Sequence, residues 1–156
     1  MFDDLDDLND FDEVDDPNEI DIGELRSWQL AVDLIKHIYD ITELWPEDDP
    51  SGLVADLRGR AIRVSGTIAN GSGRGNAWDF KRLLGSARYM LRDLETLLIL
   101  AHDLGRLDSL TQDELLREIE AVRAAIDELV AELALKTGRS NGYPPYDPSL
   151  DQFSRS

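Results

Sequence analysis

The sequence predicts an all-α protein, an antiparallel up-down-up-down four-helix bundle. Apolar residues recur every three or four positions in four successive segments, which is the period of an amphipathic helix. No segment alternates apolar and polar residues over any length, so no sheet is expected. Glycine, proline and capping residues separate the four segments by short connections, and short connections make consecutive helices antiparallel.

The first predicted helix runs from about Glu24 to Leu44. Asp21 and Glu24 have the spacing of an N-terminal capping pair, and Pro46 lies just beyond the end. The residues expected on its inner face are Leu25, Trp28, Val32, Ile35, Tyr39 and Thr42.

The second predicted helix begins with Asp49 as its cap and Pro50 at the first helical position. It ends in Gly71-Ser72-Gly73, which would supply the positive-φ residues of a helix C-terminus. The positions expected on its inner face are Leu53, Leu57, Ala61, Val64 and Ile68.

A second stripe of this helix consists of small residues around one large one: Ala55, Gly59, Ile62, Gly66 and Ala69. Each interior glycine costs about 1 kcal/mol relative to alanine, so the stripe predicts the close approach of another backbone. That backbone is either a neighbouring helix of the same bundle or a second subunit.

The third predicted helix opens at Asn76 with Asp79 and closes at Gly105. Its apolar positions are Phe80, Leu84, Ala87, Leu91, Leu94, Leu98 and Ala101. The fourth opens at a capping box over residues 111–114 and ends at Gly138. Its apolar positions are Leu115, Ile119, Val122, Ile126, Leu129 and Leu133.

The chain therefore divides into an acidic low-complexity tail (1–22), the bundle (23–137) and a Pro-rich tail or strap (138–156). The acidic tail is interleaved with apolar residues at every third position: Phe2, Leu5, Leu8, Phe11 and Val14. One interpretation is a disordered, solubilising tail. The other is a segment that docks its apolar stripe on a partner or lies against the basic middle of the chain.

Composition excludes several classes of protein. The 156 residues include no cysteine, which rules out disulfides and thiolate metal sites. No apolar run reaches the roughly 18 residues of a membrane span, and the first residues do not form a secretory signal. We expect a cytoplasmic protein with no membrane association.

The net charge of −17 is unevenly distributed. Residues 1–24 hold 12 acidic and no basic residues, whereas residues 55–92 hold 8 basic and 2 acidic ones. The basic candidates for a binding surface are Arg60, Arg63, Arg74, Lys81, Arg82, Arg88 and Arg92. They contact RNA phosphates or an acidic partner in one interpretation, and form ion pairs within the bundle or between subunits in the other.

No catalytic constellation is recognisable. His37 and His102 are the only histidines, and the Glu-x-x-His pattern of di-iron bundles is missing. The loop from Gly71 to Gly75 follows a helix rather than a strand and lacks the Lys-Ser/Thr ending of a phosphate-binding loop. We predict no enzyme activity, no metal and no cofactor.

The order of certain residues resembles a known family. Trp28-Gln29-Leu30-Ala31 opens the first helix and Trp45-Pro46 follows it; Gly71-Ser72-Gly73-Arg74 ends the second helix, and Leu94-Glu95-Thr96 lies in the third. Over about residues 25–135 the chain is similar to the bacterial four-helix-bundle family encoded in ribosomal-RNA intervening sequences. That family includes the accessory variability determinant of diversity-generating retroelements. Departures occur at Thr67 and Asn70, where the family usually has Asn and Glu.

The resemblance implies a non-enzymatic homo-oligomer, a barrel-like pentamer, and in the retroelement member a partner reverse transcriptase with its template RNA. The leading hypothesis is thus an accessory module for an RNA-handling protein, with the acidic tail competing for the basic surface. A second hypothesis is a protein-interaction scaffold that docks through its acidic tail and binds no nucleic acid. A third is an enzyme that uses a ligand or metal inside the bundle.

Overall fold

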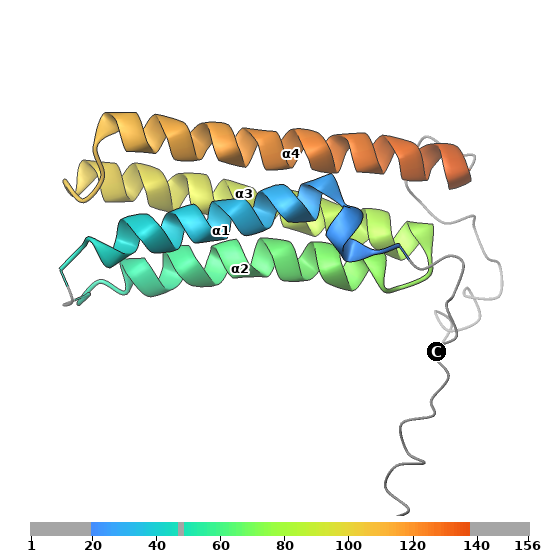
Figure 1. The fold of residues 1–156 in the computed structure, drawn as a ribbon, viewed down its shortest axis with the longest axis horizontal. Coiled ribbons are helices and arrows are strands. Elements are labelled where there is room, and N and C mark those ends of the chain that lie inside the picture. Colours follow the sequence, from blue (N-terminus) through green and yellow to red (C-terminus); the bar gives the residue numbers. More distant parts are fainter. Residues whose placement is uncertain (1–19, 47–48, 138–156) are drawn as a thin grey trace, which may run out of the picture.

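The structure, a computed structural model, describes residues 20–46 and 49–137. A short 3-10 helix, η2 (Ile22–Glu24), precedes four α-helices: α1 (Arg26–Glu43), α2 (Leu53–Ser72), α3 (Ala77–Asp103) and α4 (Ser109–Thr137). The four helices run in alternating directions side by side (Figure 1), and none of the described residues forms a strand. The predicted all-α antiparallel bundle is confirmed.

The helices form a square in which each contacts its two neighbours. α1 packs against α2 and α4, and α3 packs against the same two helices, with the most extensive contact between α2 and α3. The start of α1 lies at the same end of the bundle as the turn between α2 and α3 (Figure 1). The outer surfaces of α2 and α3 adjoin, and the described chain begins, at Ile20, at the end of the bundle where these two helices connect.

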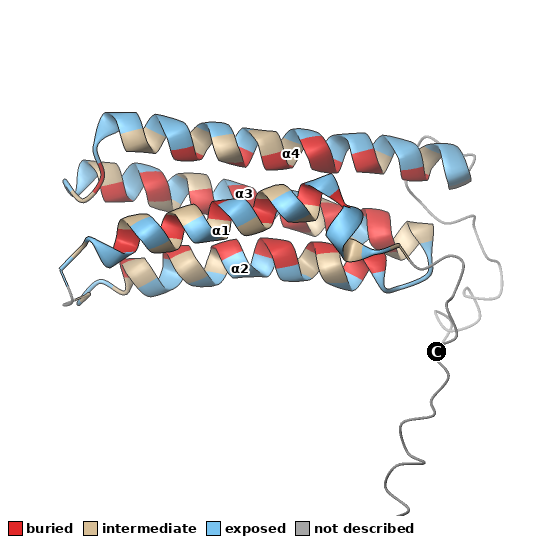
Figure 2. Ribbon diagram, in the orientation of Figure 1, coloured by how far each residue is buried: buried red, intermediate tan, exposed pale blue. Residues whose placement is uncertain are grey.

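The core occupies the space between the four helices, where the buried sides face one another (Figure 2). Every apolar position predicted for the inner faces of α2, α3 and α4 is buried. Leu57, Leu91 and Ile119 are each at most 1% exposed. In these three helices the positions of the apolar residues were sufficient to identify the side that packs inward.

The inner face predicted for α1 was partly wrong. Leu25 and Thr42 are buried as expected, but the rest of the buried face consists of Ser27, Ala31, Leu34 and Ile38. The predicted members Trp28, Val32, Ile35 and Tyr39 are only partly buried. α1 carries apolar residues on two adjacent stripes, and the stripe with the smaller side chains faces the core. Tyr39 instead lies at the boundary with α2, where Arg58 sits 4.3 Å above its ring.

The ends of the first two helices also differ from the prediction. Asp21 caps η2, accepting a hydrogen bond from the backbone N–H of Gly23, rather than α1. Asp49 accepts a hydrogen bond from the N–H of Val54 as a cap should, but Gly52 is the residue that precedes α2. The positive φ expected within residues 71–73 occurs instead at Gly75, with φ of 64°.

The ends of α3 are as predicted. Asn76 caps the helix through a hydrogen bond from the N–H of Trp78, and Gly105 follows it with φ of 74°. α4 begins at Ser109, before the predicted capping box. Asp108 accepts a hydrogen bond from the N–H of Thr111 at 2.7 Å. That bond is the main reason why the pKa of Asp108 lies below its ordinary value.

Two predicted segments lie outside the described residues: nearly all of the acidic tail, with Phe2, Leu5, Leu8 and Phe11, and the C-terminal tail from residue 138 onward. Within residues 20–46 and 49–137, no helix has the length and apolar character needed to cross a membrane.

Candidate nucleic-acid and partner interface

The seven predicted basic residues do not lie on one continuous stripe. Five of them, Arg60, Arg63, Arg74, Arg82 and Arg92, are on α2, α3 or the turn between them and are at least partly exposed. We call these five residues the α2–α3 basic surface. The other two, Lys81 and Arg88, are engaged elsewhere.

An ion pair joins the two helices at the middle of this surface. The Nη1 atom of Arg60 lies 3.0 Å from Oδ2 of Asp93, and both side chains remain about half exposed. Arg63 follows Arg60 by three residues, and Arg92 immediately precedes Asp93. Because a helix rises 1.5 Å per residue, Arg63 and Arg92 lie within about one turn of the same level on adjoining helices.

Arg63, Arg74 and Arg92 are exposed, and none of them forms an ion pair with another residue in the described part of the chain. Arg82 is 65% exposed and makes only a 3.6 Å contact with Asp79 one turn before it. Exposed pairs of that kind are worth at most about 1 kcal/mol, so the Arg82 guanidinium can be drawn to another anion.

Lys81 and Arg88 face different surroundings. Arg88 pairs with Asp127 of α4 at 3.2 Å. For this residue the structure thus agrees with the interpretation in which the basic side chains form ion pairs within the bundle. Lys81 is only 8% exposed, and its ammonium lies 4.4 Å from the ring centroid of Trp78. Burial therefore removes Lys81 from an open binding surface, and the ion pair directs Arg88 toward α4 rather than toward α2.

The small-residue stripe of α2 faces away from the bundle. A Cβ atom added at Gly59 or Gly66 would meet no atom within 4 Å, and Ile62 between them is 47% exposed. The possibility that the stripe admits a neighbouring helix of the same bundle is therefore wrong. Beside it, an open depression is lined by Ala55, Asp56, Gly59, Arg60 and Arg63.

The glycine that does admit another helix is Gly71. A Cβ atom built there would lie 2.5 Å from Cδ2 of Phe80 and 3.4 Å from Cβ of Leu83. Gly71 is buried in the last turn of α2, so its missing side chain allows α3 to approach. The sequence had predicted a positive-φ, helix-ending role for this glycine, but its φ is not positive and its role is packing.

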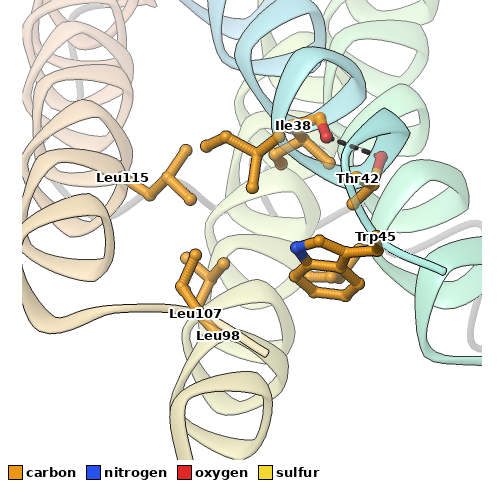
Figure 3. A pocket seen from close by; sticks show the side chains of 8 residues that line it. Ile38, Thr42, Trp45, Leu98, Leu107 and Leu115 are labelled. Carbon is orange, nitrogen blue, oxygen red and sulfur yellow. Dashed lines mark hydrogen bonds between the residues drawn. The ribbon is translucent and has the colours of Figure 1, made fainter. Parts of the chain in front are cut away.

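A small cavity lies inside the bundle near the end of α1 (Figure 3). Its volume is about 10 Å³, which is enough for about one water molecule. Apart from Thr42, the residues that line it are apolar or aromatic, and Trp45 closes one side. The Thr42 hydroxyl donates to the carbonyl of Ile38 at 2.7 Å and accepts a hydrogen bond from Nε of Arg58.

Contacts between α4 and its neighbours join residues whose pairing the sequence did not predict. Nδ1 of His37 lies 2.8 Å from a carboxylate oxygen of Glu118. Arg123 bonds both Glu95 of α3 and Glu120, and these bonds, above all the one to Glu95, raise the pKa of the guanidinium. No group of three or more potential ligands in the described residues is arranged to hold a metal ion.

Sequence reasoning also missed Tyr89, which is 78% exposed on α3 between Arg88 and Arg92. The signal was present in the sequence. Tyr89 is out of phase with the apolar positions Leu84, Ala87 and Leu91, which predicts exposure.

Comparison with known proteins identifies the family. A family model described as 23S rRNA-intervening sequence protein matches residues 23–128, from η2 to a point about two thirds of the way along α4. No curated protein matches the chain. Because the family match spans well over half of the chain and agrees with the observed four-helix bundle, this protein belongs to the 23S rRNA-intervening sequence protein family.

Proposed function

We propose that the chain is a non-enzymatic, oligomeric accessory protein that binds RNA through the α2–α3 basic surface. By resemblance to the retroelement member of its family, its protein partner would be a reverse transcriptase or a similar RNA-handling protein. The observation that carries the proposal is the exposure of Arg63, Arg74 and Arg92 without an ion pair to any described residue. In a chain with a net charge of −17, such cations are available to phosphate groups.

RNA binding is tested by titrating a fluorescently labelled structured RNA with the full chain at several salt concentrations. The test variant replaces Arg63, Arg74 and Arg92 with glutamine. The matched control replaces Arg26, Arg106 and Arg117, which lie outside the α2–α3 basic surface, so that both variants lose the same charge. We expect the test variant to bind more weakly and with less salt dependence, and the control to bind nearly as the wild type does.

The open stripe of α2 supports the oligomeric part of the proposal. Gly59 and Gly66 leave space above the helix, and the partly exposed Ile62 supplies apolar surface between them. Small residues allow the backbone of a second copy to come close, and the family resemblance points to a pentamer. A C5-type ring needs one patch of each protomer to meet a different patch of the next.

Assembly is tested by replacing Gly59 and Gly66 together with glutamine, a good helix former. We expect the wild type to sediment as an oligomer and the variant as a smaller species with unchanged helical content, because nothing within the protomer obstructs either side chain. The control replaces Ala124 and Ala131 with glutamine and should leave assembly intact. These two exposed residues of α4 have the same seven-residue spacing as Gly59 and Gly66. A monomeric wild type would refute the oligomer.

A further inference from the structure

Tyr89 lies in the middle of α3 with 78% of its surface exposed. Among the described residues, no cation stacks on its ring and no group forms a hydrogen bond with its hydroxyl group. Tyrosine has a lower helix propensity than alanine or leucine, and an exposed one contributes little burial. Folding of a single chain therefore gives no reason for an aromatic residue at this position.

The residues on the preceding turn leave the ring accessible. Side chains of a helix lean toward its N-terminus, so the side chain of Tyr89 is directed toward the turn that holds Gly85 and Ser86. A Cβ atom added at Gly85 would meet nothing within 4 Å, which shows that the space above this turn is open. Neither glycine nor serine is large enough to cover the outer face of a phenol ring.

Positive charge flanks the ring along the same helix. Arg92 lies three residues after Tyr89 and Arg82 seven residues before it, about 4.5 Å and about 10.5 Å away along the helix axis. Both positions share the outward side of α3 with Tyr89. Asp93, the nearest carboxylate in sequence, is paired with Arg60 at 3.0 Å, which compensates its charge.

We propose that Tyr89 is a stacking platform for an unpaired RNA base, with Arg82 and Arg92 contacting the flanking phosphates. The inference rests on the proposed function and makes its ligand more specific: single-stranded RNA, or the unpaired loop of a folded one. Stacking on an aromatic ring tolerates any base, because every base has a π-face. A base within a duplex is already stacked on both sides, so duplex RNA should not use Tyr89.

The experiment uses the full chain, a short single-stranded RNA that carries one 2-aminopurine, and the same RNA annealed to its complement. The variants are Tyr89→Ala and Tyr89→Phe, with Leu135→Ala as the control because Leu135 is 84% exposed on α4. Affinity is measured at low salt, and stacking is measured as quenching of the 2-aminopurine fluorescence.

We expect Tyr89→Ala to weaken single-strand binding by about tenfold and to remove the quenching, because one aromatic–base stack is worth about that much. Tyr89→Phe should keep both, since the hydroxyl is not needed for stacking. Duplex binding by Tyr89→Ala and all binding by Leu135→Ala should be unchanged.

Wild-type affinity in Tyr89→Ala, or equal losses in Tyr89→Ala and Tyr89→Phe, would overturn the stacking platform while RNA binding by the protein stood. A change in sedimentation of Tyr89→Ala would overturn it too, because it would assign the ring to a contact between subunits. If the wild type bound neither RNA, the proposed function itself would fail and the platform with it.

Discussion

Replacing Gly71 with leucine is expected to destabilise the bundle by about 3 kcal/mol or more, the upper end of the cost of overpacking. Even the first atom of the new side chain would lie 2.5 Å from the ring of Phe80. That ring is 3% exposed within the core, so it cannot move aside without displacing other buried residues. The unfolding free energy is measured by urea denaturation at a fixed protein concentration.

The matched control is Gly85→Leu. Gly85 is also a helical glycine, but nothing lies within 4 Å of its added Cβ atom, so the change should be neutral or stabilise the helix by up to about 1 kcal/mol. The double variant Gly71→Leu with Phe80→Ala should lose less unfolding free energy than the two single variants lose together. Phe80→Ala removes the ring with which the leucine clashes, and the leucine fills part of the space that the ring leaves. Equal stability of the Gly71 and Gly85 variants would show that α2 and α3 do not approach as closely as described.

Removing residues 1–19 is expected to raise the affinity for RNA at low salt by about tenfold or more, because these residues carry ten acidic side chains and no basic one. Ile20 is half-buried against the core, so a chain that begins there keeps all of the described fold. Ile20 also lies at the end of the bundle that carries the α2–α3 turn, which includes Arg74 (Figure 1). The gain in affinity should shrink as salt rises, since screening weakens the attraction of the basic surface both for the acidic tail and for RNA.

Two full-length variants separate charge from apolar docking. One replaces the acidic residues of the tail with their amides and should bind RNA as tightly as the truncated chain does. The other replaces Phe2, Leu5, Leu8 and Phe11 with serine and keeps the charge, so it should bind RNA as the wild type does. Unchanged RNA affinity after truncation would contradict competition by the tail, and would favour a scaffold that uses the tail to dock on a protein.

Where the sequence carried one unambiguous apolar stripe, the packing could be predicted from it. α3 shows this well, because Leu84, Leu91 and Leu98 repeat every seven residues and all are buried. α1 could not be predicted in the same way, because its apolar residues cover two adjacent stripes and the inward one includes the small side chains of Ser27 and Ala31. Which stripe faces inward depends on how its side chains fit against those of α2 and α4, and the sequence of α1 alone does not contain that information.

The candidate site shows the same division between local and distant information. Exposure of Arg63 and Arg92 follows from their phase on the helices and is readable from the sequence. The partners of Arg60 and Arg88 are Asp93 and Asp127, which lie 33 and 39 positions away and are determined by helix packing. The glycines of α2 could not be told apart from the sequence either. Gly71 faces a neighbouring helix whereas Gly59 and Gly66 face outward, and a pattern of small residues does not say which of these applies.

The measurement that tests the central claim most directly is the salt dependence of RNA affinity for the wild type and for the variant with glutamine at Arg63, Arg74 and Arg92. Each phosphate contact contributes about 0.7 to 0.9 to the slope of log affinity against log salt. We predict that the triple variant loses about two units of slope, and that the control with glutamine at Arg26, Arg106 and Arg117 keeps the wild-type slope. Identical slopes for all three proteins, or no RNA binding at low salt, would contradict RNA recognition by the α2–α3 basic surface.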